Sequence, residues 1–223
     1  MREIIYDTET TGKRHGSDKI VEIAAIELEN NIPTGRVFHK LINPERDIPD
    51  EVVAVHGITN EKVKDAPTFR EIMPELIDFF RGAKAVAHNS EFDEKFIDRA
   101  LKDADHKESF WGIVGGTVDT LRLSRQIWVG KNESGVNYKH SLDAILDRCE
   151  IDRSHRVLHG ALLDAELLKE AYLVMKAKKA EMGPGIEDDV PRAPIKRLDL
   201  SKMELPLAAI FQESPANPRT HRP

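Results

Sequence analysis

Two carboxylates stand two positions apart near the start of the chain, in the segment EIIYDTET at residues 3–10. The segment has the length and the β-branched content of a buried strand. Side chains two apart on a strand point to the same face, so Asp7 and Glu9 project together. Two adjacent carboxylates repel unless a cation neutralises them, which makes the pair a candidate metal site. For a lone D-x-E motif, a strand end that leads into a turn is the commoner explanation.

A third carboxylate, Asp93, follows the short apolar segment AKAVAH at residues 83–88. Ser90 and Asp93 resemble a helix capping box, which favours a structural role. The functional alternative places Asp93 at a helix start that faces the strand ends, where open α/β sheets often carry their sites.

His159 and Asp164 stand five residues apart where a long helix is expected to begin. Five residues of regular helix turn through about 500°, so the two side chains do not share a helix face. They converge only if His159 lies in a loop before the helix, where Gly160 allows a bend. A histidine that caps a helix is the commoner case, whereas a histidine beside a carboxylate suits proton transfer near neutral pH.

The three motifs together change this balance, because four carboxylates and one histidine lie at the ends of predicted core elements. Four negative charges balance two divalent cations, and two such ions roughly 3.5 to 4 Å apart are the known arrangement for phosphodiester cleavage. Mg²⁺ or Mn²⁺ suits ligation by oxygen atoms alone. The residues therefore predict a metal-dependent phosphodiesterase site.

The elements that position these residues alternate between strands and helices. Residues 19–30 and 36–43 predict an antiparallel hairpin, with its turn at Asn30, Asn31, Pro33 and Gly35. Apolar spacing predicts helices over residues 68–82, 92–101, 121–128, 140–149 and 161–181, with short strands at 83–88 and 117–120. This order favours an α/β fold with an antiparallel portion near the N-terminus.

The composition is that of a globular protein of 223 residues, with 40% apolar and 32% charged residues. No apolar run approaches the roughly 18 to 20 residues that span a bilayer, and the N-terminal residues do not resemble a secretory signal. Cys149 is the only cysteine, which excludes an internal disulfide and favours a reducing cytoplasm. The net charge of -6 argues against binding nucleic acid by charge alone, unless metal ions or a partner supply positive charge.

The motifs resemble those of the DEDDh 3′→5′ exonucleases: D-x-E in a first strand, H-N-x-x-F-D at residues 88–93 and H-x-A-x-x-D at the last helix. Further matches are V-x-x-V-H-G-I-T at 52–59, H-S-L-D-A at 140–144 and S-H-R-x-L-H-G-A-L-L-D-A-E-L-L at 154–168. Within this family the chain closely resembles the proofreading epsilon subunits of bacterial DNA polymerase III, over about residues 1–180.

The resemblance implies an RNase H-like fold, with a mixed five-stranded sheet flanked by helices. It also implies 3′→5′ removal of nucleoside monophosphates with two divalent cations, Mg²⁺ or Mn²⁺. The implied metal ligands are Asp7, Glu9, Asp93 and Asp164, and His159 is implied to deprotonate the attacking water. The implied substrate contacts are Asp7, Glu9, Thr10, Glu51, His56, Phe92 and Asp164. For Glu51 and His56 the alternative is an exposed polar segment with a turn, and Phe92 suits a core position equally well.

The chain divides by composition into an exonuclease domain at 1–182, a Pro/Gly-rich linker at 183–197 and a C-terminal segment at 198–223. Seven of the twelve prolines lie after Gly183, and the apolar cluster of the last segment is too small to form its own core. The segment is therefore either disordered or folds on a partner. The resemblance implies binding of the polymerase alpha subunit through this tail, and a theta-type accessory subunit and a sliding clamp as further partners.

Three hypotheses for function follow. The leading one is a DNA proofreading exonuclease, and the second is a stand-alone exonuclease that processes RNA 3′ ends. The third is a non-catalytic scaffold for the polymerase, which the intact acidic set argues against because like charges packed together without metal are costly.

Overall fold

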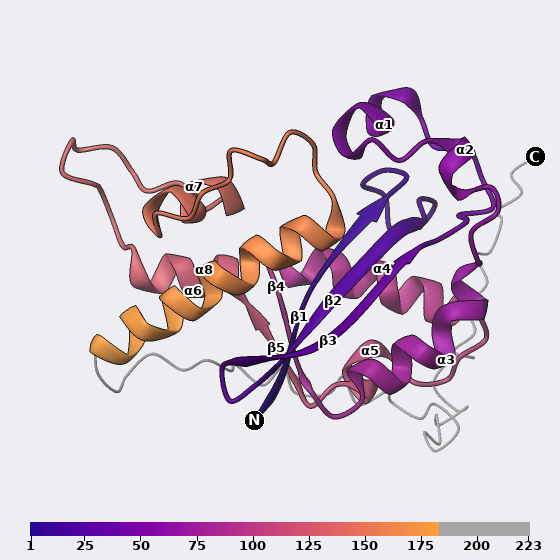
Figure 1. The fold of residues 1–223 in the computed structure, drawn as a ribbon, viewed down its shortest axis with the longest axis horizontal. Helices are drawn as coiled ribbons and strands as arrows, with labels where there is room; N and C mark the ends of the chain where they lie inside the picture. The colour runs from indigo at the N-terminus through magenta and orange to yellow at the C-terminus, as the bar shows by residue number, and fades with distance from the viewer. Residues whose placement is uncertain (183–223) are drawn as a thin grey trace, which may run out of the picture. The chain divides into compact units, whose positions relative to one another are not determined.

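The computed structural model describes residues 1–182, so the predicted linker at 183–197 and tail at 198–223 lie outside the described residues. One mixed sheet runs in the strand order β3-β2-β1-β4-β5 (Figure 1). Its strands are β1 (Arg2–Thr10), β2 (Ile20–Glu29), β3 (Ile32–Leu41), β4 (Lys84–Ala87) and β5 (Gly116–Asp119). The first three strands pair antiparallel, whereas β4 pairs parallel with both β1 and β5. The predicted α/β class, the five-stranded mixed sheet and its N-terminal antiparallel portion are confirmed.

The helices of the described part are α1 (Asp50–His56), α2 (Asn60–Val63), α3 (Phe69–Phe80), α4 (Ser90–Asp103), α5 (Phe110–Ile113), α6 (Thr120–Ile127), α7 (Leu142–Arg148) and α8 (Ala161–Glu181). Each helix expected from apolar spacing forms, and the Ser141 side chain caps the start of α7. The short helices α1, α2 and α5 have no counterpart among the expected elements, and α2 and α5, with four residues each, are too short to show a helical period. None of the helices within residues 1–182 is long and apolar enough to cross a membrane.

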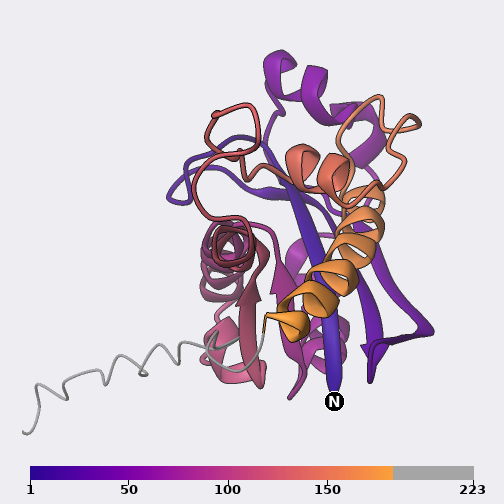
Figure 2. The same ribbon diagram turned by 90° about the vertical axis from the view of Figure 1, so that its left-hand side faces the viewer.

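The two faces of the sheet pack against different helices, and β1 shows how. Ile4 and Tyr6 belong to the core shared with α3, α4 and α5, whereas Ile5 belongs to the core shared with α6, α7 and α8. This alternation is the period of two expected of a central strand. Figures 1 and 2 show α8 lying along one face of the sheet, which it shares with α6 and α7. The later residues of β1 should follow the same alternation, so each of their side chains points toward one of the two helical layers.

A small apolar cluster holds α1 and α2 near the sheet, with Val21 of β2 packing against Ile58 and Val63. The segment before α8 is tied to α1 by a backbone hydrogen bond, in which His159 N–H donates to the Val55 carbonyl at 3.1 Å. These contacts bring α1 beside the start of α8, although more than a hundred residues separate the two segments.

The hairpin turn differs from its prediction. Only Asn30 and Asn31 form it, with φ angles of 52° and 69°, and β3 already begins at Ile32. Two successive left-handed residues are typical of the tight turns that join antiparallel strands, and Asn tolerates that conformation. Pro33 and Gly35 thus lie within β3, which stands at the edge of the sheet where a proline is accepted.

The predicted capping box at the start of α4 is also wrong. The N-cap of α4 is Asn89, in a left-handed conformation with φ 63°, and Ser90 is already the first helical residue. Asp93 therefore makes no reciprocal cap with Ser90, and its carboxyl group is available to the end of the sheet.

Candidate active site

β1 carries two of the predicted carboxylates to the end of the sheet. Asp7 and Glu9 share the face of Ile5, which packs toward α8. Thr8 points to the opposite face, where its Oγ1 donates a hydrogen bond of 2.6 Å to Asp93 Oδ1. Asp93 is buried in the first turn of α4. Asp93 of α4 therefore meets β1 on the face opposite to that of Asp7 and Glu9.

The start of α8 brings the predicted histidine and carboxylate together. His159 lies in the loop before the helix, with its Nδ1 3.3 Å from Oδ2 of Asp164. Asp164 is buried in the first turn of α8, whereas half of the His159 side chain is exposed. The predicted convergence is confirmed, but Gly160 is not the reason for it. The φ angle of Gly160 is −169°, an extended conformation that any residue adopts.

Glu22 of β2 fixes the start of α8. Its Oε2 accepts the backbone N–H of Ala161 at 2.9 Å, and its Oε1 lies 2.7 Å from Nε2 of His39 on β3. The first N–H groups of a helix have no partner within the helix, so a buried carboxylate that accepts one both satisfies and positions it. This contact links the segment of His159 and Asp164 to the sheet.

Burial and mutual repulsion raise the pKa values of the carboxyl groups at the strand end. For Asp7 the rise is well above the usual range, caused first by burial and then by the charges of Asp93 and Glu9. Burial, reinforced by the charge of Asp164, raises the pKa of Glu9 to about 8. Burial also raises the pKa of Asp93 to about 7, although the hydrogen bond from Thr8 opposes it. Groups perturbed in this way need either protons or cations at neutral pH.

A divalent cation fits the residues present. Glu9, His159 and Asp164 each offer one ligand atom, and these three atoms lie within 4.8 Å of one another. Asp7 lies on the same face of β1 as Glu9. Its pKa is also raised, by burial and by the neighbouring carboxylates, so a cation beside it would be stabilising. Carboxylate oxygens are the ligands that Mg²⁺ and Mn²⁺ prefer.

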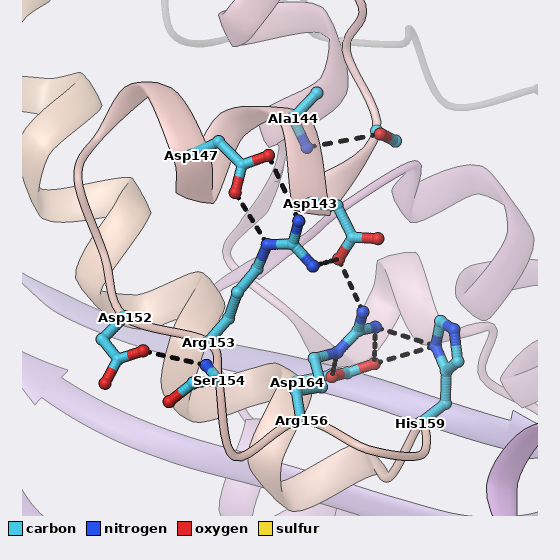
Figure 3. Close-up of polar contacts among 10 residues, drawn as sticks. Asp143, Ala144, Asp147, Asp152, Arg153, Ser154, Arg156, His159 and Asp164 are labelled. Carbon is cyan, nitrogen blue, oxygen red and sulfur yellow. Dashed lines mark hydrogen bonds and ion pairs between the residues drawn. The ribbon is translucent and has the colours of Figure 1, made fainter.

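One cation of the protein already lies in this group. Arg156 donates from Nη2 to Asp164 Oδ2 at 2.6 Å and bonds Asp164 Oδ1 through Nε (Figure 3). Its Nη1 donates to Asp143 Oδ1 at 2.7 Å. The sequence prediction assigned no role to Arg156 or Asp143, although both lie within the matched motifs at 154–168 and 140–144.

A cleft of about 550 Å³ opens beside these residues. Its lining includes three members of the predicted site, Asp7, His159 and Asp164, together with the basic or imidazole side chains His88, Arg125 and His140. Acidic groups that bind cations therefore share one hollow with groups that suit phosphate oxygens.

The remaining predicted substrate contacts are placed differently. Thr10 is buried, and its Oγ1 donates to the Gly12 carbonyl at 2.6 Å. Glu51 is exposed in the first turn of α1. Phe92 is half-buried against the core, with its ring 4.9 Å from that of Phe96. These three side chains are thus not part of the carboxylate cluster itself.

His56 is buried at the end of α1. Its Nδ1 accepts the backbone N–H of Ile58 at 3.0 Å. Its Nε2 is buried and makes no hydrogen bond of regular geometry within residues 1–182, although the Thr10 backbone lies near the ring. Burial lowers the pKa of His56, which favours the neutral ring. A buried donor without a partner is uncommon in native proteins and suits a ligand atom.

Thr8 and Glu22 are the other functional positions that sequence reasoning missed. The alternation that pairs Asp7 with Glu9 also predicts that Thr8 faces the opposite layer, so this signal was present. The contact between Glu22 and the start of α8 joins residues 139 positions apart, which pattern alone does not reveal.

Comparison with known proteins agrees with this geometry. A model of the exonuclease family RNase_T matches residues 4–172. The chain belongs to this exonuclease family. Its relatives include the DNA polymerase III subunit epsilon of Rickettsia conorii, 44% identical over 78% of this chain and 73% of that protein. The same subunit of Escherichia coli K12 is 39% identical over 197 residues, 84% of this chain and 76% of that protein. The chain is accordingly a 3′→5′ exonuclease of the epsilon type.

Solved exonuclease structures share the fold. Exonuclease X in complex with 5′ overhanging duplex DNA superposes with a TM-score of 0.60 at 24% identity, covering 80% of this chain and 93% of that one. The zinc-bound E. coli ExoI–ssDNA complex gives a TM-score of 0.71 at 16% identity, over 81% of this chain and 42% of that one. At these identities the likeness shows the exonuclease architecture alone.

Proposed function

We propose that this exonuclease removes nucleotides from DNA 3′ ends at a two-metal site and acts as the proofreading subunit of a replicative polymerase. The proposed metal ligands are Asp7, Glu9, Asp93 and Asp164, with His159 as the general base. The observation that carries the proposal is the convergence of these carboxylates, from both layers of the fold, beside one half-exposed histidine.

Two divalent cations, when bound, stabilise the charge that develops on the attacking and leaving oxygens of the phosphodiester. The protein's own contribution is to hold the ligands in place. Thr8 fixes Asp93 through a 2.6 Å hydrogen bond, and Glu22 fixes the helix start that carries Asp164. Mg²⁺ and Mn²⁺ are the ions proposed, because the set is dominated by carboxylate oxygens.

His159 accepts the proton of the attacking water. Its position in a loop, with half of the side chain exposed, gives water and substrate access to the ring. Asp164 lies 3.3 Å from Nδ1 and orients the imidazole, as a carboxylate does beside many catalytic histidines. No other histidine within residues 1–182 shares a ligand cluster with the carboxylates.

The terminal nucleotide is proposed to lie in the 550 Å³ cleft. His56 lies at the end of α1, outside the lining of this cleft, and is proposed to donate from Nε2 to the part of the nucleotide that extends toward α1. Glu51 on the same short helix, Thr10 at the end of β1 and Phe92 in α4 are proposed as further contacts of the nucleotide. The proposed metal-binding carboxylates Asp7, Glu9 and Asp164 complete this set.

Proofreading suits the charge of the protein. A mismatched 3′ end is already unpaired, so little unstacking energy is needed to bring it to the site. With a net charge of -6, the chain gains DNA affinity from a tethered polymerase, through effective concentration. The proposed tether is the polymerase alpha subunit, bound by residues 198–223 through the linker 183–197, and a theta-type subunit and the sliding clamp are proposed as further partners.

Degradation of a 3′-labelled single-stranded DNA and of its RNA counterpart tests the activity, with Mg²⁺, with Mn²⁺ and with chelator. We expect release of mononucleotides from DNA that chelator stops. Cleavage of RNA alone would transfer the protein to RNA processing, and no cleavage with either ion would leave the scaffold hypothesis.

A truncation to residues 1–182 tests the domain assignment and the polymerase partner. We expect the shortened protein to keep the nuclease activity and to lose co-purification with the alpha subunit. An unfolded truncation product would show that the tail belongs to the core, and retained binding would move the polymerase contact to the exonuclease domain.

A further inference from the structure

We propose that Arg156 is an internal counter-cation, which neutralises Asp164 in the metal-free protein and must leave it when a divalent ion binds. The proposal rests on the proposed metal site and concerns a residue that the site itself does not include. Figure 3 shows its guanidinium lying between Asp143, His159 and Asp164.

The first argument is the state of Asp164. Both carboxylate oxygens accept from Arg156, Oδ2 from Nη2 at 2.6 Å and Oδ1 from Nε. Only 7% of the Arg156 side chain and 5% of the Asp164 side chain are exposed, so water screens this forked pair weakly. Because the guanidinium covers both oxygens, a metal ion and Arg156 compete for the same carboxylate.

The second argument is the state of His159. Nη2 of Arg156 lies 2.8 Å from Nδ1 of the imidazole, and a guanidinium only donates hydrogen bonds. Nδ1 must therefore be the acceptor, which places the proton of the neutral ring on Nε2. In this arrangement Arg156 occupies the one basic nitrogen of the proposed general base.

When Arg156 leaves this position, the hydrogen bonding of both Asp164 and His159 changes. With the guanidinium gone, Nδ1–H can donate to Asp164 Oδ2, from which it is 3.3 Å away. The lone pair of the neutral ring then lies on Nε2, on the side of the ring away from Asp164. Binding of metal is thus coupled to the tautomer that lets His159 accept a proton from water.

The third argument is the anchor that retains Arg156. Nη1 donates to Oδ1 of Asp143 at 2.7 Å, and Asp143 lies in the first turn of α7 with 46% of its side chain exposed. This bond does not involve Asp164. Arg156 can therefore swing away from the carboxylate while Asp143 keeps it at the rim, ready to return when the ion leaves.

Arg153 offers a matched control. It belongs to the same loop and carries the same charge, but it pairs with Asp147 at 2.8 and 3.2 Å and approaches Asp143 at 3.6 Å (Figure 3). Its loss removes one positive charge near the site without uncovering Asp164. An effect of overall charge on metal affinity should therefore appear when either arginine is replaced. An effect of displacing the guanidinium from Asp164 should appear only when Arg156 is replaced.

Calorimetric titration of the full chain with Mg²⁺ alone measures the competition. We expect Arg156→Gln to bind Mg²⁺ about tenfold more tightly than the wild type, because the ion no longer displaces a charged hydrogen-bonded group. Arg153→Gln should stay within about twofold of the wild type. Equal affinities for Arg156→Gln and the wild type, or weaker binding by Arg156→Gln, would overturn the displacement. A wild type that binds no Mg²⁺ would overturn the proposed metal site as well, so the two failures are distinct.

NMR of the wild-type protein tests the same step on the unaltered site, with a variant used only to assign one signal. The Nε–H signal of Arg156, identified by its loss in Arg156→Lys, should shift on addition of Mg²⁺. The ¹⁵N signals of His159 should report a proton on Nε2 without Mg²⁺ and on Nδ1 with it. Unchanged Arg156 and His159 signals, while the ion binds, would show that the pair is a permanent structural contact.

Discussion

The strand-borne and helix-borne halves of the site carry the same functional group with opposite electrostatic arrangements. On β1, burial and neighbouring carboxylates raise the pKa of Asp7, and they raise that of Glu9 to about 8. On α8, Asp164 is more deeply buried than Asp7 and Glu9, but it accepts hydrogen bonds from Arg156 on both oxygens. Asp7 and Glu9 on β1 thus have no paired cation in the described part of the chain, whereas Asp164 on α8 is neutralised by Arg156. A protein that must fold before it meets its metal ions can leave only part of such a cluster unneutralised.

The largest expected effect comes from the strand-borne half. Asp7→Asn should lower exonuclease activity by about 10³-fold or more, because metal-ion stabilisation of the transition state contributes several kcal/mol. The same change removes a repelling carboxylate, so the metal-free protein should melt at an equal or higher temperature. Turnover on single-stranded DNA and thermal melting with chelator measure the two effects.

Asp78→Asn is the matched control for this prediction, because Asp78 is exposed on α3 and lies outside the site. It should leave turnover unchanged. Full activity of Asp7→Asn at ordinary Mg²⁺ concentrations would remove Asp7 from the metal ligands, and a fall in melting temperature would contradict the repulsion.

The next effect concerns the helix-borne half. His159→Gln should lower turnover by about 10²- to 10⁴-fold, the usual contribution of a general base, while the affinity for single-stranded DNA changes little. Glutamine preserves a polar side chain beside Asp164 but accepts no proton. Turnover and binding measured in parallel separate the two roles, and equal losses in both would show that His159 binds substrate instead.

The comparison also predicts a pH dependence of stability. Asp7, Glu9 and Asp93 have pKa values raised in the folded protein, so the folded state binds more protons than the unfolded chain between about pH 4.5 and 8. Unfolding then releases protons, and the metal-free protein should lose stability as the pH rises through this window.

Thermal melting from pH 5 to pH 8, with chelator and with saturating Mg²⁺, measures this effect. The melting temperature should fall by several degrees with chelator and by much less with Mg²⁺. Parallel curves in the two conditions would place the titrating groups outside the metal site.

What could be predicted from sequence follows the range of the interactions. The period of two on β1 placed Asp7 and Glu9 on one face, and the apolar spacing gave α8 its bounds, because both depend on neighbours in the chain. The contacts that complete the site join Glu22 to α8 and Arg156 to α7 and α8, and they depend on packing. Local rules also failed where a single residue adopted a left-handed conformation, as Asn89 does before α4.

Gly160 and Gly57 both lie beside the loop that carries His159. We expect substitution of Gly160 to have the smallest effect on turnover and stability, and substitution of Gly57 to have a larger one. Gly160 is extended, and a Cβ at this position meets nothing within 4 Å. Gly57 has a φ of 69°, and a Cβ there would lie 2.8 Å from Cδ1 of Leu158. The requirement for glycine thus lies at the end of α1, not at the residue next to His159.

Gly160→Ala should therefore change stability by less than about 0.5 kcal/mol, because a weaker helix cap and a less flexible unfolded chain have opposite and similar effects. Its turnover should stay within about twofold of the wild type, since Glu22 positions the start of α8. Gly57→Ala should cost about 1 to 2 kcal/mol for the left-handed conformation and displace Leu158, lowering turnover as well. Denaturant unfolding and turnover compare the variants, and a larger loss in Gly160→Ala would show that the loop needs glycine to bring His159 to Asp164.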